Sequence, residues 1–504
     1  MRTEKSIINV IINIINYIIM ILPNLLIRKI FLMSLGSQLL GLNSLYQNIV
    51  GFLCISELGI SLAISYSLYD PVAKNKRKVI KGYIDYFTKF YRKVSLFIFC
   101  IGLFITPYIH IFINSNIPYM KVYFIMFVIN TCITYLFSAK FCMLSVYQEN
   151  YIITTVETIV NLVISILQIF ILYLYPNYFL FIAVQIISKL VQMLILNIIV
   201  NKKFRWLKKE KGVLEKSKIK ELYITMKGLF FHKISAMVFF ATDNIVISSF
   251  LNLTYVSNFG NYYLIISGLQ TIMIKIFDGI TASIGNLLVE NNNEKSYDIY
   301  EKSQFISFFI TSIISICTLN TINIFIDIWV GHEYVIDSLS VVLLVINFYF
   351  LGMRLPIEKF KETSGIYYED RYWAVLQAVI NIVMSIIMVN IIGLPGVFLG
   401  TCISNYTIEF WVKPKLVYRK IFKKDLKDYF IKYSRYSLIG LFAFIVSNIL
   451  TGFINESSVE NFIIKNIINI LVVLVIYNII FRESEEYIYI KNIIFRKNNI
   501  KIKV

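Results

Sequence analysis

Apolar runs long enough to cross a bilayer recur along the whole chain, separated by short polar loops. A helix rises ~1.5 Å per residue, so ~20 apolar residues span ~30 Å of hydrocarbon. Apolar residues fill 58% of the 504 positions, whereas a soluble domain has about 45–50%. We therefore predict an all-α integral membrane protein with about 14 transmembrane helices. The predicted spans are residues 7–31, 44–68, 92–113, 121–143, 151–175, 178–200, 224–250, 255–287, 303–327, 338–354, 371–391, 395–413, 434–453 and 461–481.

Positive charge predicts the orientation of these spans. Lys and Arg, which give the chain its net charge of +19, gather after the second, sixth and twelfth spans and in the C-terminal tail. The positive-inside rule then places both termini in the cytoplasm of a multi-pass protein. The excess of Ile, Asn and Lys indicates an AT-rich bacterial genome, and hence a bacterial cytoplasmic (inner or plasma) membrane. An alternative role for the basic loops is recognition of anionic membrane lipid.

A faint similarity between the second and eighth spans predicts an internal repeat. In each case an Asn (Asn43, Asn261) precedes a segment that contains small residues. This pattern favours two six-helix lobes, built as parallel repeats around a central cavity, with two C-terminal helices appended. The predicted divisions are an N-terminal lobe (1–201), a basic cytoplasmic linker (202–222), a C-terminal lobe (223–425), spans 13 and 14 (426–482) and a basic cytoplasmic tail (483–504).

Polar residues inside the first span are the first candidates for a site. Asn9, Asn13, Asn16, Asn24 and Arg28 fall within an arc of about 120° on one helix. Such residues usually face a water-filled cavity or a partner, because ionisable groups in hydrocarbon are costly. The alternative is hydrogen bonding between helices, with the arginine reaching outward to the interface.

Spans seven and eight carry a second group of polar candidates. Lys233, Asp243 and Asn244 lie in the seventh span, and Lys275 and Asp278 lie three residues apart in the eighth. If the last two pair with each other, the lysine is structural. If a ligand phosphate competes for that lysine, it is a binding group.

Two further carboxylates lie within apolar runs. Glu57, near the middle of the second span, is either a candidate for coupling to H⁺ or Na⁺ or a neutral group hydrogen-bonded within the bundle. Glu157 in the fifth span is expected to form a structural ion pair with Lys189 in the sixth.

Signatures of an enzyme, a metal site or a nucleic-acid-binding protein are missing from the sequence. No GxxxxGK[ST] phosphate-binding loop occurs, the three histidines are scattered, and the six cysteines lie in apolar segments without a CxxC pair. The positive charge sits in short loops between spans and not on a soluble fold. We therefore expect a transporter without a cofactor, apart from the coupling ion.

Several short segments resemble bacterial polysaccharide flippases, the Wzx-type lipid-linked oligosaccharide transporters of the multidrug/oligosaccharidyl-lipid/polysaccharide (MOP) superfamily. Their order and spacing carry the resemblance from about residue 7 to 425. The segments are Leu40-Gly41-Leu42-Asn43-Ser44-Leu45-Tyr46, Ser56-Glu57-Leu58-Gly59-Ile60, Ser67-Leu68-Tyr69-Asp70-Pro71, Thr242-Asp243-Asn244-Ile245, Thr281-Ala282-Ser283-Ile284-Gly285-Asn286, Met353-Arg354-Leu355-Pro356, Gly365-Ile366-Tyr367, Asp370-Arg371-Tyr372 and Gly396-Val397-Phe398-Leu399-Gly400.

The resemblance implies a flippase for an undecaprenyl-diphosphate-linked oligosaccharide, which feeds a capsule, exopolysaccharide, O-antigen or teichoic-type polymer. It also implies alternating access around a cavity lined by spans 1, 2, 7 and 8, and a pathway shared with glycosyltransferases and a polymerase. Arg28, Lys233 and Lys275 would then meet the diphosphate, because phosphate contacts to cations are strong. Asn24, Glu57, Asp243, Asn244 and Asp278 would line the cavity or bind the coupling cation.

Other functions stay open at this point. A cation-coupled multidrug exporter of the same superfamily would typically have about twelve spans. A lipid II flippase is a second transporter alternative. A membrane glycosyltransferase or polymerase would need a large outer loop, and a scaffold would not need charges inside its spans.

Overall fold

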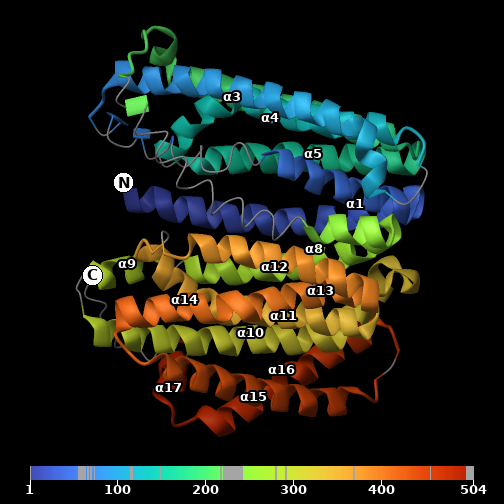
Figure 1. Ribbon diagram of the computed structural model, residues 1–504, viewed down its shortest axis with the longest axis vertical. Coiled ribbons are helices and arrows are strands. Elements are labelled where there is room, and N and C mark those ends of the chain that lie inside the picture. Colours follow the sequence, from blue (N-terminus) through green and yellow to red (C-terminus); the bar gives the residue numbers. More distant parts are fainter. Residues whose placement is uncertain are drawn as a thin grey trace. The chain divides into compact units, whose positions relative to one another are not determined.

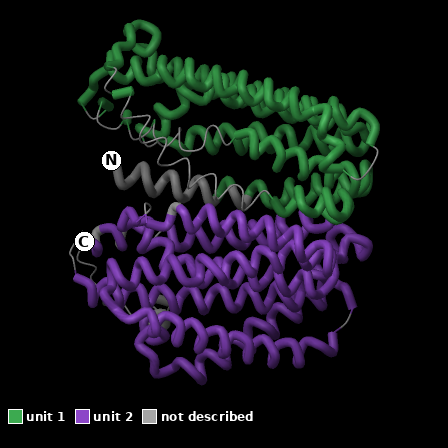
Figure 2. Tube along the Cα trace, in the orientation of Figure 1, with its two compact units in different colours: residues 1–257 green, residues 258–504 purple. Residues whose placement is uncertain are grey.

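The described part of the chain is helical and forms two compact units (Figure 2). In the computed structural model, the described residues are 2–54, 64, 67–68, 71–72, 74–113, 117–147, 149–215, 218–219, 242–278, 281–289, 292–366, 369–454 and 456–494. Unit 1 comprises residues 1–257 and unit 2 residues 258–504. Ten helices of the described residues are long and apolar enough to cross a membrane. The predicted lobe and linker boundaries stay predictions.

Unit 1 is a bundle of long helices that run alongside one another (Figure 1). Their outward faces are apolar and exposed, as expected of helices in lipid. The helices are α1 (Arg2–Leu53), α3 (Arg77–Ile105), α4 (Met120–Val146), α5 (Asn150–Leu174) and α6 (Tyr178–Lys203), with short 3₁₀ turns η2 (Thr106–Phe112) and η3 (Arg205–Lys208).

Gly36 divides α1 into two helical segments. Its φ of 81° and ψ of 172° lie where a residue with a Cβ is strained, so the chain can break the helix here at little steric cost. The helix runs on through Pro23, where the sequence suggested a kink. The loop predicted between the first two spans therefore reduces to a single residue.

Unit 2 contains the remaining helices, which also run alongside one another (Figure 1). They are the rest of α8 (Leu253–Asp278), α9 (Thr281–Val289), α10 (Asn293–Val330), α11 (Ser338–Thr363), α12 (Arg371–Ile392), α13 (Leu394–Ser404), α14 (Phe410–Val417), α15 (Leu426–Thr451), α16 (Val459–Phe481) and α17 (Glu485–Ile494). The eighth predicted span, 255–287, is covered by two helices, since α8 ends at Asp278 and α9 begins at Thr281.

Glycines bring α12 and α13 into close contact. A Cβ at Gly396 would lie 2.2 Å from the backbone of Met388, and one at Gly400 would lie 2.4 Å from Ser385 Oγ. Small residues spaced by four allow helix backbones to approach in this way where no hydrophobic effect drives helices together.

The twelfth predicted span is not one regular helix. A π-helical turn, η5 (Asn405–Glu409), interrupts it before α14, and a second one, η6 (Tyr418–Phe422), follows α14 beyond the predicted end of the span. The buried Asn405 amide in η5 donates to Asn347 Oδ1 on α11 at 3.0 Å and accepts from Gln377 on α12 at 3.0 Å. These polar contacts between helices anchor the irregular turn.

Aromatic side chains join the last two spanning helices to α10. The Phe308 ring stacks on Tyr436 of α15 at 4.7 Å and on Tyr477 of α16 at 5.0 Å between centroids. All three side chains are buried. Spans 13 and 14 are therefore packed into unit 2 and are not loosely attached.

Candidate functional site

A polar cavity of about 520 Å³, open on one side, lies in unit 1. Its walls come from α1, α4, α5 and α6, near the middle of these helices. Eleven of its fourteen lining residues are polar or charged. They are Asn24, Gln47, Asn130, Glu157, Asn161, Ser165, Gln168, Gln185, Ser188, Lys189 and Gln192, alongside Met20, Ile27 and Ile164.

Helical spacing places the polar side chains of α5 on one face. Glu157, Asn161 and Gln168 follow one another at intervals of four and seven residues, which brings them to the same side of the helix. The opposite face presents Ile166 and Phe170, which are 68% and 62% exposed. The helix is therefore polar toward the bundle interior and apolar toward lipid, the reverse of a soluble surface helix.

The sixth helix repeats the same arrangement. Gln185, Ser188, Lys189 and Gln192 share one face and line the cavity from α6. This double pattern of amides at helical spacing was visible in the sequence. Of the residues in this pattern, only Glu157 and Lys189 were singled out from the sequence, as an ion pair.

The charged groups of the cavity do not neutralise each other by contact. Lys189 Nζ donates to Gln192 Oε1 at 3.1 Å, one turn along its own helix. Among the described residues no carboxylate lies within 4.0 Å of this amine, so the ion pair expected with Glu157 is not formed. Both groups nevertheless line the same cavity.

Two amides of the cavity have buried atoms without a partner. Asn130 Oδ1 and Gln168 Nε2 make no hydrogen bond within the described part of the chain. The Gln168 side chain is only 5% exposed. Because a buried polar atom left unbonded is destabilising, these atoms indicate a place for a polar occupant.

The structure places the candidates of the first span in unit 1. Asn24 lines the cavity. Arg28, one turn further along α1, is half-buried and donates from Nη2 to the carbonyl oxygen of Ser257 at 3.0 Å. The guanidinium thus has a protein acceptor at the first turn of α8.

Of the seventh-span candidates, Asp243 and Asn244 are described and Lys233 is not. Both described residues are half-buried, and one oxygen of each (Oδ1) is buried without a hydrogen-bond partner in the described structure. Lys233 and the second-span Glu57 lie outside the described residues.

The eighth-span candidates belong to unit 2 and do not pair with each other. Asp278 forms an ion pair with Lys359 Nζ of α11 at 2.7 Å, whereas Lys275 is exposed. A carboxylate at the last residue of α8 can reach the neighbouring helix, which leaves the lysine available for a ligand.

A partly buried network of four charges in unit 2 was not predicted. Arg354 and Lys413 are cross-linked by Glu358 and Glu409, and Lys413 Nζ lies 3.0 Å and 2.7 Å from the two carboxylates. Arg354 Nε lies 3.2 Å from Glu358 and also pairs with Glu409. The signal for it was present in the sequence, since each helix carries an opposite-charge pair at i, i+4. The two positive and two negative charges balance, so the network joins α11 to α14.

Unit 2 also contains a half-exposed ion pair. Outside the membrane-spanning segments, Glu369 pairs with Lys420, and that hydrogen bond holds the pKa of the Glu369 carboxyl below its ordinary value.

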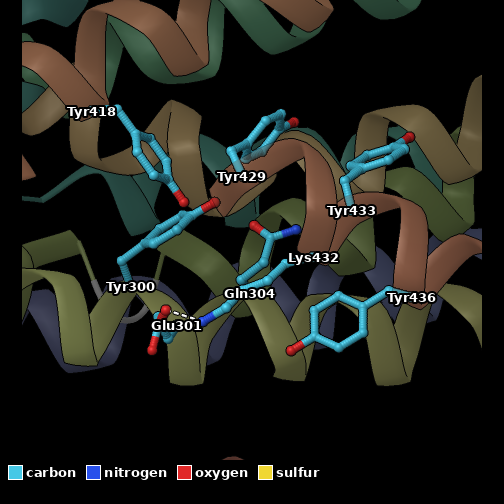
Figure 3. Close-up of a pocket in the computed structure, with 8 residues that line it drawn as sticks. All are labelled: Tyr300, Glu301, Gln304, Tyr418, Tyr429, Lys432, Tyr433 and Tyr436. Carbon is cyan, nitrogen blue, oxygen red and sulfur yellow. Dashed lines mark hydrogen bonds and ion pairs between the residues drawn. The ribbon is translucent and has the colours of Figure 1, made fainter. Parts of the chain in front are cut away.

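A tyrosine-rich pocket in unit 2 is too small for a ligand (Figure 3). Its volume is about 10 Å³, room for one water molecule at most. Lys432 and Glu301 form an ion pair at its edge. The aromatic rings therefore pack α15 against α10. The lining residues are Tyr300, Glu301, Gln304, Tyr418, Tyr429, Lys432, Tyr433 and Tyr436.

Comparison with known proteins finds similar structures but no similar sequences. No protein-family model and no curated protein matches the sequence. Among solved structures, the lipid II flippase MurJ in an inward closed conformation aligns with a TM-score of 0.68 at 16% identity, over 95% of this chain and 99% of that one.

Multidrug transporters of the MATE family align as well. An inward-facing MATE transporter of the MOP superfamily gives a TM-score of 0.59 at 13% identity, over 77% of this chain and 91% of its own. The MATE multidrug transporter DinF-BH also gives 0.59, at 15% identity, over 84% of this chain and 97% of its own. These neighbours are transporters and not enzymes. The chain thus has the fold of these structures, and its ten long apolar helices make it a multi-pass membrane protein.

Proposed function

We propose that this protein is a flippase that moves an undecaprenyl-diphosphate-linked oligosaccharide across the bacterial cytoplasmic membrane by alternating access. The observation that carries the proposal is the open polar cavity of about 520 Å³ lined by helices whose outer faces are apolar. A glycan head group crossing bare hydrocarbon would lose its hydrogen bonds to water, at several kcal/mol for each group. A polar interior removes that barrier while the isoprenoid tail stays in lipid.

Extent of structural similarity favours a flippase over a multidrug exporter. The lipid II flippase matches 95% of this chain, whereas the two MATE transporters described above match 77% and 84%. The packing of the helices α15 and α16 into unit 2 is consistent with a transporter that has more spans than the roughly twelve expected of a multidrug exporter. A lipid II flippase remains the competing substrate assignment within the same mechanism.

Arg28, Lys233 and Lys275 are the proposed contacts to the diphosphate. Asn24, Glu57, Asp243, Asn244 and Asp278 are proposed to line the path or to bind a coupling H⁺ or Na⁺. The polymer supplied would be a capsule, an exopolysaccharide, an O-antigen or a teichoic-type chain, made with glycosyltransferases and a polymerase of the same pathway. Both termini are proposed to lie in the cytoplasm.

The test is leaflet-resolved analysis of lipid-linked intermediates in cells depleted of the protein. We expect an undecaprenyl-diphosphate-linked oligosaccharide to accumulate on the cytoplasmic side and to clear when the wild-type gene is restored. Unchanged intermediates together with altered drug sensitivity would instead identify a multidrug exporter. Accumulation of lipid II alone would identify a lipid II flippase.

A further inference from the structure

The chemistry of the unit 1 cavity is that of a site for neutral, hydroxyl-rich groups. Half of its fourteen lining residues are carboxamides. An amide offers two donors and an acceptor with two lone pairs, so it can bond to a hydroxyl in either direction. None of the described residues that line the cavity is aromatic, and such a site has no apolar platform for a flat drug-like molecule.

The charges of the cavity argue against an anionic ligand. Glu157 and Lys189 both line it and formally cancel. A diphosphate near Glu157 would meet a like charge, and Lys189, the one cation among the described lining residues, already donates to Gln192 at 3.1 Å. The phosphate and the rest of the substrate head therefore need different sites.

The volume of the cavity and its polar atoms without hydrogen-bond partners also support a ligand site. A volume of about 520 Å³ lies in the ~300–1,000 Å³ range of small-molecule sites and far exceeds the ~30 Å³ of one water molecule. Asn130 Oδ1 and Gln168 Nε2 are buried there without a partner in the described structure, although Gln168 is almost fully enclosed by protein (5% exposed).

We propose that the amide-lined cavity of unit 1 is a saccharide subsite that binds the neutral sugar portion of the substrate and excludes its diphosphate. The inference rests on the proposed flippase function and adds which part of the substrate this cavity recognises. Specificity for the glycan then resides in α5 and α6, separate from the cationic contacts.

The experiment compares two lipids that differ only in the glycan. Full-length protein in nanodiscs is titrated with the lipid-linked oligosaccharide purified from depleted cells and with undecaprenyl diphosphate. The variant Asn161→Leu/Gln168→Leu replaces two lining amides by side chains of similar size. Asn390→Leu makes the same replacement at an exposed position of α12, outside the cavity, and is the control.

We expect the double variant to bind the oligosaccharide lipid about tenfold more weakly, because two hydrogen bonds are lost. Its affinity for undecaprenyl diphosphate should stay within about twofold of wild type, and Asn390→Leu should bind both lipids normally. If the double variant does not fold, Gln168→Leu alone is used, with a loss of about threefold expected.

An equal loss for both lipids, or no loss for either, would overturn the saccharide subsite while leaving the flippase proposal intact. Wild-type protein that binds neither lipid would overturn the proposed function itself, and the subsite with it.

Discussion

Among single residues, Arg28 can act through its charge or through its hydrogen bond to the Ser257 carbonyl at 3.0 Å. Arg28→Lys keeps the charge, whereas Arg28→Gln keeps an amide donor and loses the charge. If the charge meets the diphosphate, polymer export should fall about ten- to a hundredfold in the Gln variant, since one charge-assisted contact is lost. The Lys variant should retain most export.

Export per amount of membrane-inserted protein is the measurement. Normal export by Arg28→Gln together with failure of Arg28→Lys would assign the residue to the structural bond and remove it from the substrate path.

The buried charge network makes a second prediction at this scale. Lys413→Met leaves Glu358 and Glu409 short of one cation, and removing one partner of a buried pair costs about 3–5 kcal/mol. We expect a clear drop in the thermal unfolding temperature in detergent. Lys420→Met is the matched control, since its pair with Glu369 is half-exposed and should contribute about 0–1 kcal/mol. Equal effects of the two substitutions would show that burial does not strengthen the network.

At the scale of elements, the contact between α12 and α13 predicts a position-dependent effect of alanine. Gly400→Ala would place a Cβ 2.4 Å from Ser385 Oγ, so the helices must move apart, at about 1–3 kcal/mol. Gly440→Ala on α15 meets its nearest atom, on Phe308, at 3.6 Å. Since alanine favours helix by about 1 kcal/mol over glycine, this control should be neutral or stabilising. The measurement is the thermal unfolding temperature of both variants. An unchanged unfolding temperature of Gly400→Ala would contradict the close packing of α12 and α13.

Apolar runs predicted most helices because a bilayer imposes length and hydropathy on every span. The predictions were least accurate where polar residues form ion pairs or hydrogen bonds with one another. The tenth span was predicted to end at 354, but α11 continues to Thr363 since Arg354, Glu358 and Lys361 all have ion-pair partners. The π turn η5 of the twelfth span is anchored by the amide contacts of Asn405, which hydropathy does not report.

For the whole molecule, the charge distribution predicts which loops face the cytoplasm. In a variant whose native cysteines are replaced, Tyr119→Cys should react with a membrane-impermeant maleimide in intact cells, because Tyr119 is 74% exposed in a predicted outer loop. Lys209→Cys, in the predicted cytoplasmic linker, should react only after permeabilisation. Reversed labelling would invert the predicted orientation.

The candidate site was only partly predictable from sequence. Asn24, singled out because it belongs to a polar stripe in an apolar span, lies at the wall of the unit 1 cavity. The walls contributed by α5 and α6 were not predicted, since a single sequence does not show which helices face each other. The pairing of Asp278 with Lys359 depends on tertiary contact in the same way.

Each of the helices α5 and α6 has one polar and one apolar face, and this affects how they insert into the membrane during synthesis. Inserted one at a time, each helix would bring a charge, Glu157 or Lys189, into contact with lipid at about 2.5–3.5 kcal/mol for a central position. Only a short turn, Tyr175–Asn177, joins them. If the two helices leave the translocon together as a hairpin, their polar faces pack together and keep these charges away from lipid. The polar interior of unit 1 then begins to form before the remaining helices are in place.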